Sequence, residues 1–106
     1  VSNSPAETIV RKLISLGAEV VVHDPYCRET FGAKKAPNVI RAVRGKDCIV
    51  IATDHEPFKK LSLRGIKALM KEKPLIVDCR RMINAAEARK HGFLYIGTGY
   101  GSTDVN

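Results

Sequence analysis

A continuous apolar run from Cys48 to Ala52 constrains the fold more than any other stretch, because it is rich in β-branched residues. A strand carries this pattern when both of its faces are covered, as in a parallel sheet between layers of helices. The run ends abruptly in Thr53, Asp54 and His55. Open α/β sheets bind ligands at the carboxyl ends of their strands, so this ending indicates a candidate binding edge.

Two further apolar runs end in polar residues in the same way. They are residues 20–22, followed by His23, Asp24 and Pro25, and residues 75–77, followed by Asp78, Cys79 and Arg80. Parallel strands have their carboxyl ends on one side of a sheet. We therefore expect His23, Asp54 and Arg80 to lie together at a single rim.

Helix signals alternate with these strands. The expected helices start at Ser4-Pro5, at Asn38, at Pro57 with a second cap at Ser62, and at Asn84; the first, second and last end at Gly17, Gly45 and Gly92. Ser or Asn at the cap position and Gly after the last turn are typical helix boundaries. The strands are expected at 19–23, 47–52, 75–78 and 93–97, with a loop containing a short strand or turn at 26–37. The small, polar tail from 98 to 106 is expected to fray.

Strands that alternate with helices predict an α/β fold with a mainly parallel sheet. Right-handed crossovers restrict this sheet to a doubly wound, Rossmann-like arrangement with helices on both faces. The chain of 106 residues shows no linker or repeat, so we expect a single domain over residues 1–106.

Charge and cysteine content narrow the classes of function. The net charge of +7 favours anionic partners, but the basic residues are scattered, which does not indicate a nucleic-acid surface. No apolar run reaches the roughly 18 residues of a membrane span, and no leader is visible. The three cysteines lack CxxC spacing, so neither a zinc site nor a disulfide framework is predicted, and a reduced, cytoplasmic setting fits. The start on Val1 indicates a piece of a longer protein.

Arg80 is the strongest single candidate for ligand binding. It follows a buried strand directly, and its planar guanidinium suits a phosphate or a uracil ring. The alternative is a structural ion pair with Asp78 or Asp54. Arg81 is expected to point away and to be exposed.

Two other constellations are weaker. His23 and His55 with Asp24, Asp54 and Asp78 contain metal-ligand residue types, but their spacing is generic and such Asp residues more often cap turns. Cys79 with His23 or His55 would need a base within about 3 Å to act as a nucleophile. More often, Cys48 and Cys79 would be buried, inert thiols.

The stretch from Gly97 to Gly101 does not match the dinucleotide fingerprint, because its third glycine comes one residue early and no helix follows. We interpret it as a flexible exit from the last strand.

The residues also resemble a known family. The matching stretches are Ser4-Pro5-Ala6, residues 17–26 reading GAEVVVHDPY, residues 51–55 with Phe58, residues 76–80, and Gly92-Phe93 with Tyr95, Gly97 and Gly99. In order and spacing they resemble the carboxy-terminal, UDP-sugar-binding domain of the UDP-glucose/GDP-mannose dehydrogenases.

The resemblance implies an enzyme that oxidises the primary alcohol of a UDP-sugar to a carboxylate with NAD, for polysaccharide biosynthesis. NAD and the catalytic cysteine belong to the amino-terminal and middle domains of such enzymes, so this chain alone is expected to hold no cofactor and no catalytic residue. Arg80 falls on the family's substrate-binding arginine; Asp54, His55 and Asp78 are weaker substrate-binding candidates. A homo-oligomer is implied as well.

Three departures from the family pattern matter. Cys79 stands where the family has Gly, and Ser2 stands where it has an Arg near the NAD site. The family's first, central strand is lacking before Ser4. The strands at 19–23 and 47–52 are therefore expected either to pair directly or to leave a gap that another copy or a distorted packing fills.

The sugar is predicted from Thr53-Asp54-His55, which is similar to the UDP-N-acetylmannosamine and UDP-N-acetylglucosamine branch. UDP-glucose 6-dehydrogenase is the alternative. A stand-alone Rossmann-like module that binds another anion is the second alternative.

Overall fold

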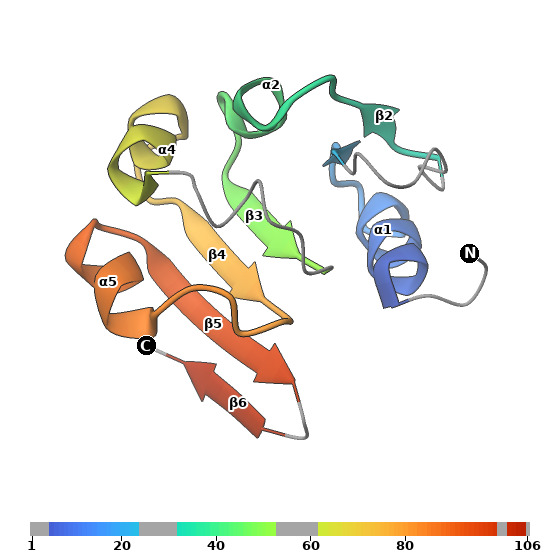
Figure 1. The fold of residues 1–106 in the computed structure, drawn as a ribbon. Coiled ribbons are helices and arrows are strands. Elements are labelled where there is room, and N and C mark those ends of the chain that lie inside the picture. Colours follow the sequence, from blue (N-terminus) through green and yellow to red (C-terminus); the bar gives the residue numbers. More distant parts are fainter. Residues whose placement is uncertain (1–4, 24–31, 53–61, 100–101, 106) are drawn as a thin grey trace. The chain divides into compact units, whose positions relative to one another are not determined.

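The computed structural model describes residues 5–23, 32–52, 62–99 and 102–105 (Figure 1). The chain forms two compact units, Val1–Ala42 and Val43–Asn106. Each unit is described by itself below, and the expectation of a single domain over residues 1–106 stays a prediction.

The first unit begins with helix α1 (Pro5–Ser15). Its end is closed by two main-chain hydrogen bonds, from the N–H of Gly17 to the carbonyl of Ile14 (2.9 Å) and from the N–H of Ala18 to that of Leu13 (3.0 Å). This pairing requires a left-handed residue after the helix, and Gly17 has a φ of +92°. The expected helix and its glycine stop are confirmed.

Strand β1 (Val21–Val22) pairs in parallel with β2 (Lys34–Lys35) in a two-stranded sheet. The short strand expected within 26–37 is thus β2. Helix α2 (Val39–Val43) follows, and its first turn is capped by Asn38, whose Oδ1 accepts a hydrogen bond from the N–H of Arg41 at 2.8 Å. The cap expected at Asn38 is confirmed.

The second unit is built on a four-stranded sheet in the order β3-β4-β5-β6. Strands β3 (Cys48–Ile51), β4 (Leu75–Asp78) and β5 (Leu94–Gly99) are parallel, and β6 (Ser102–Val105) is antiparallel to β5. Figure 1 shows the three parallel arrows pointing one way and β6 the other.

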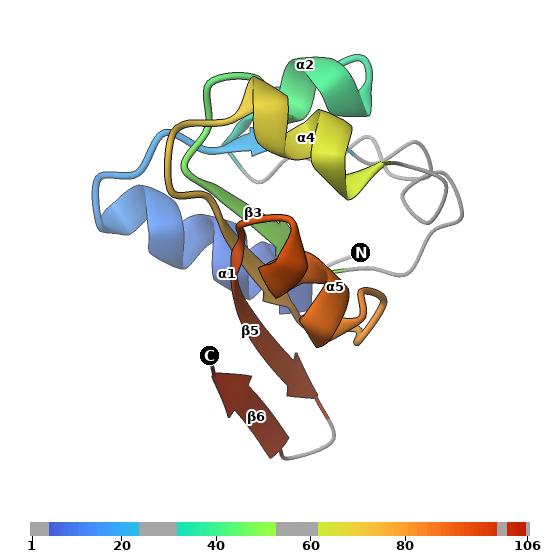
Figure 2. The same cartoon turned by 90° about the vertical axis from the view of Figure 1, so that its left-hand side faces the viewer.

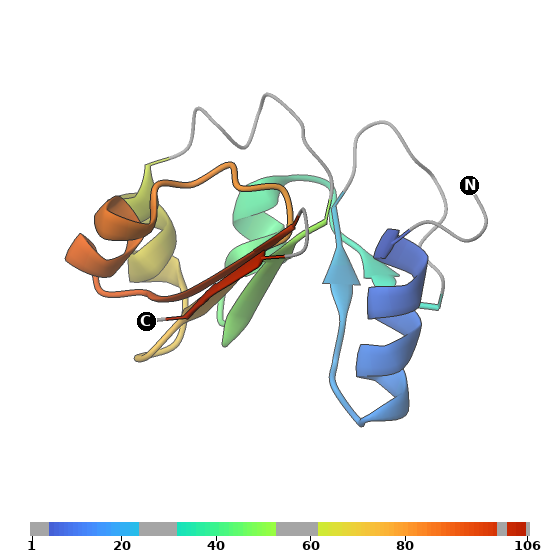
Figure 3. The same ribbon diagram turned by 90° about the horizontal axis from the view of Figure 1, so that it is seen from below.

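Helices α4 (Leu63–Leu69) and α5 (Ala85–Lys90) connect the parallel strands. Strands that follow one another in a single direction across a sheet, joined by right-handed crossovers, place their helices on one face. Figure 3 shows α4 and α5 on the same face of this sheet.

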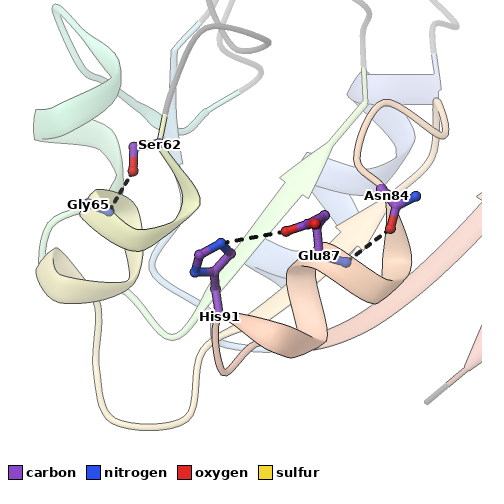
Figure 4. A network of polar contacts seen from close by, with 5 residues as sticks. All are labelled: Ser62, Gly65, Asn84, Glu87 and His91. Carbon is purple, nitrogen blue, oxygen red and sulfur yellow. Dashed lines mark hydrogen bonds and ion pairs between the residues drawn. The ribbon is translucent and has the colours of Figure 1, made fainter.

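The caps predicted for these helices are present (Figure 4). Ser62 Oγ accepts from the N–H of Gly65 at 3.2 Å, and Asn84 Oδ1 accepts from the N–H of Glu87 at 3.0 Å. Glu87 lies 3.7 Å from His91 Nε2 at the other end of α5.

The core of this unit lies between the sheet and its helices. Its buried apolar residues are Val43, Ile51, Ile66, Met70, Ile76, Ala88, Phe93 and Tyr95. Buried and less buried positions alternate along β4 and β5, as expected when one face of each strand meets a helix layer.

The structure confirms the Rossmann-like α/β class and corrects one detail. In its described residues, 98–99 and 102–105, the tail is not frayed, because β5 continues to Gly99 and β6 pairs with it (Figure 2). The described part of the Gly-rich stretch, Gly97–Gly99, was interpreted as a flexible exit but belongs to a paired strand. Helices on both faces of the sheet stay a prediction, because α4 and α5 lie on one face of the second unit's sheet.

The strands expected at 19–23 and 47–52 belong to different sheets in the described residues. Because they also belong to the two separately described units, direct pairing and a gap in place of a central strand both stay predictions.

Candidate functional site

The carboxyl ends of the three parallel strands lie level with one another. Ile51 is the register partner of Asp78, and Asp78 is the register partner of Gly97. The N–H of Cys79 also donates to the carbonyl of Ile51 at 2.9 Å, which joins the exits of β3 and β4. Ala52 directly follows Ile51 at this rim, whereas Asp54 and His55 lie outside the described residues.

Asp78 closes β4 with a fully buried carboxylate, 0% exposed. Oδ1 accepts hydrogen bonds from the N–H groups of Arg80 (3.2 Å) and Met82 (3.1 Å), and Oδ2 accepts from the N–H of Ile83 (2.8 Å). The hydroxyl of Tyr95 also donates to Oδ2 at 2.9 Å. This geometry favours the turn-capping interpretation of Asp78 over direct contact with a ligand.

Arg80 is the exposed residue of the turn that Asp78 holds. No ion pair joins its guanidinium to Asp78 within the described part of the chain. An ion pair with Asp54, the other structural alternative, falls on a residue outside that part. The turn thus places the guanidinium of Arg80 at the rim, where it is not paired with the buried carboxylate of Asp78.

Arg81 differs from expectation, since it is half-buried rather than exposed. Its φ of +53° lies in the left-handed region, where the chain reverses its direction. Arg81 was expected to be exposed because side chains alternate between the two faces along a strand. This alternation ends where the backbone turns.

His23 follows β1 in the first unit, and its Nδ1 lies 3.2 Å from the carbonyl oxygen of Ala36. The proposed rim of His23, Asp54 and Arg80 stays a prediction, because Asp54 is outside the described residues and His23 belongs to the other unit. Asp24 and Cys27 are outside the described residues too.

Both described cysteines are free thiols. Cys79 is half-buried, whereas Cys48 is exposed at the start of β3, so the expectation of a buried Cys48 is wrong. Cys48 keeps an exposed surface, but the protein atoms around its thiol partly desolvate it and thereby raise its pKa; the charge of Asp47 is the second cause of the rise. A raised pKa leaves little thiolate at neutral pH, which disfavours a nucleophilic role.

The described residues contain no group of three or more His, Cys, Asp or Glu side chains that could hold a metal ion. None of their helices has the length and apolar character needed to cross a bilayer.

Comparison with known proteins adds to this geometry. Residues 1–85 match the model of the UDP-glucose/GDP-mannose dehydrogenase family, UDP binding domain. The chain belongs to this family.

Relatives of the UDP-glucose/GDP-mannose dehydrogenase family agree with that assignment. The chain is 36% identical over 99 residues to a UDP-N-acetyl-D-mannosamine dehydrogenase from Pyrococcus horikoshii, covering 93% of this chain and 22% of that protein. It is 34% identical over 102 residues to a UDP-glucose 6-dehydrogenase from Rhizobium meliloti, covering 92% of this chain and 23% of that one.

A solved structure of similar fold is that of an NDP-N-acetyl-D-galactosaminuronic acid dehydrogenase from Methanosarcina mazei Go1. It matches with a TM-score of 0.79 and 33% identity, over 88% of this chain and 20% of that chain. The chain therefore spans about a fifth of the length of the relatives that it matches.

Sequence reasoning missed the part that Tyr95 plays at this family's candidate site. A tyrosine at a buried strand position needs a hydrogen-bond partner for its hydroxyl, so the sequence could have predicted that Tyr95 forms such a bond. It could not name Asp78 as the partner, because the two residues are 17 positions apart and their contact depends on the register of β4 and β5.

Proposed function

We propose that this chain is the nucleotide-sugar-binding part of an NAD-dependent UDP-sugar 6-dehydrogenase. The enzyme would oxidise the primary alcohol of the sugar to a carboxylate in the cytoplasm, as a homo-oligomer. NAD and the reacting cysteine would come from the amino-terminal and middle domains of the same protein, and this chain alone would be inactive in oxidation. The family assignment and the similarity to named UDP-sugar dehydrogenases support this proposal.

The observation that carries the proposal is the exposed Arg80 on a turn held at the carboxyl rim of a parallel sheet. Ligands of open α/β sheets bind at this rim, and a guanidinium suits the diphosphate of a UDP-sugar. Asp54 and His55 follow the neighbouring strand and are weaker candidates for the same ligand; Asp78 would act through the turn. The basic balance of the chain, +7, favours such an anionic ligand.

UDP-N-acetylmannosamine is the sugar nucleotide we favour, because of Thr53-Asp54-His55 and the relative from Pyrococcus horikoshii. UDP-glucose is the second candidate, since a UDP-glucose 6-dehydrogenase is almost equally similar.

Calorimetric titration of the 106-residue chain with UDP tests the proposal. Arg80→Ala should weaken binding about tenfold or more, because it removes charge-assisted hydrogen bonds. Arg89→Ala, which removes another exposed arginine, from the last turn of α5, is the matched control and should leave binding unchanged.

Uridine serves as a second ligand in the same titration. If Arg80 contacts phosphate, the effect of Arg80→Ala should disappear with uridine; if it contacts uracil, the effect should remain. An Arg80→Ala variant that binds UDP as tightly as the unchanged chain would count against this site.

A further inference from the structure

The turn from Cys79 to Ile83 is organised around one buried acceptor. Three of its main-chain N–H groups, from Arg80, Met82 and Ile83, converge on the carboxylate of Asp78 within 2.8–3.2 Å. Hydrogen bonds to a charged acceptor are stronger than neutral ones, and here solvent does not compete with them. The position of that carboxylate therefore decides the path of the turn.

Tyr95 fixes the carboxylate from the neighbouring strand. Its side chain is 1% exposed, and its hydroxyl lies 2.9 Å from Asp78 Oδ2 and 3.1 Å from the carbonyl of Ile83. One phenol thus meets both the acceptor and the far end of the turn. A buried tyrosine that bridges two parts of a loop restrains their separation.

Gly97 provides the space for this contact. A Cβ at Gly97 would stand 3.0 Å from both Cε2 and the hydroxyl of Tyr95, so the ring lies over the place where a side chain would be. Gly97 is also the register partner of Asp78. The absence of a side chain at Gly97 therefore lets the Tyr95 hydroxyl reach across to Asp78.

The turn has an internal cost that these bonds offset. Arg81 adopts a φ of +53°, a conformation that costs a non-glycine residue on the order of 1 kcal/mol. Arg80 lies immediately before it and donates its own N–H to Asp78. The direction of the Arg80 side chain thus depends on the left-handed backbone at Arg81, and the hydrogen bonds to Asp78 are needed to stabilise that backbone.

We infer that Tyr95 is a positioning residue for Arg80. Through Asp78 and the carbonyl of Ile83, its hydroxyl holds the turn in the one conformation that aims the guanidinium at the ligand. This inference rests on the proposed function, in which Arg80 contacts UDP. Without the hydroxyl, the turn would populate other conformations, and the apparent affinity for UDP would fall to the intrinsic affinity multiplied by the fraction of molecules that remains competent.

A double-mutant cycle in the 106-residue chain tests this inference. Tyr95→Phe should raise the Kd for UDP about five-fold, the effect of one net hydrogen bond. In the Arg80→Ala background, Tyr95→Phe should add nothing, because the group that it positions is gone. Ile66→Val truncates a core residue in α4 and controls for lost stability; it should lower the melting temperature without changing the Kd.

Amide hydrogen exchange of the same variants reads the turn without any ligand. The amides of Arg80, Met82 and Ile83 should exchange faster in Tyr95→Phe and stay protected in Ile66→Val. Asp78→Asn, which keeps the shape of the side chain but replaces one of its two acceptor oxygens by an NH2 donor, should reproduce the faster exchange if Tyr95→Phe does not fold.

The two readouts separate the possible failures. Unchanged exchange in Tyr95→Phe, or equal losses of affinity in both backgrounds, would overturn the positioning role. If Arg80→Ala leaves UDP binding intact, the proposed function of Arg80 fails, and the role of Tyr95 in ligand binding fails with it, while faster exchange would still show its hold on the turn.

Discussion

Lys67 in α4 lies across Gly92, the residue that ends α5, so that its aliphatic chain occupies the position where a Cβ of Gly92 would stand. Gly92 has a φ of +92°. The chain thus passes from α5 to β5 through a left-handed turn at Gly92, and the Lys67 side chain lies against this turn.

Gly92→Ala is expected to destabilise the chain by about 1–2 kcal/mol, because a Cβ is strained at this φ. Crowding by Lys67 should add little, since the end of a lysine side chain is flexible. Thermal unfolding measures the loss. Gly17→Ala is the matched control, because Gly17 has the same φ of +92° with nothing within 4 Å of its Cβ position. A loss at Gly92 that Lys67→Ala abolishes would show that crowding, not backbone strain, is the cause.

Gly97→Ala is expected to destabilise the chain by about 1–3 kcal/mol, the usual cost of overpacking. The new methyl would displace the Tyr95 ring, which lies 3.0 Å from the Cβ position. Chemical denaturation gives the size of the loss. In Tyr95→Leu the clash is removed, so Gly97→Ala should cost clearly less in that background; equal costs would contradict the geometry.

Asn84→Ala is expected to cost about 1 kcal/mol, because the amide oxygen of Asn84 accepts the N–H of Glu87 at the start of α5 (Figure 4). Asn84→Asp keeps an acceptor at the same place and should leave the stability nearly unchanged. The midpoints of urea unfolding compare the two variants. Equal destabilisation by both would mean that the cap is not the source.

Cys48 is expected to react slowly with iodoacetamide at neutral pH, because desolvation and Asp47 raise the pKa of its thiol. Asp47→Asn should lower that pKa and speed alkylation. Rates measured against pH in a chain carrying Cys27→Ser and Cys79→Ser isolate Cys48. An unchanged rate profile in Asp47→Asn would exclude the charge as a cause.

The raised pKa of the Cys48 thiol also predicts how the stability of the fold changes with pH. The folded state prefers the protonated thiol, so this contribution to stability is fully present below the pKa of the unfolded thiol. It is lost as the pH rises through the raised pKa of the folded state. Unfolding measured between neutral and alkaline pH should therefore become easier towards the alkaline end.

The sequence predicted elements whose signals are local. Asn38, Ser62 and Asn84 cap helices where expected, because a cap depends on a side chain and the N–H group three residues later. The apolar runs at 48–51 and 75–78 became parallel strands for the same reason. Arg80 was placed correctly at a strand end because it directly follows one of these runs.

The features that the sequence could not predict depend on distant partners. The return strand β6 pairs with β5 through register, and its small, polar residues carry no apolar signal of a strand. The half-buried position of Arg81 follows from the turn around Asp78. The position of the Asp78 carboxylate is fixed by the hydroxyl of Tyr95, which donates a hydrogen bond to it. Contacts across strands decide each of these.

The saturated carboxylate of Asp78 has a consequence for recognition. Because it already takes the N–H groups of residues 80, 82 and 83, this turn cannot cradle an anion with its main chain as a glycine-rich loop does. An anion here has to be bound by a long, flexible side chain such as that of Arg80. This side chain can adjust to ligands of different length, and its interaction with the anion weakens as ionic strength rises.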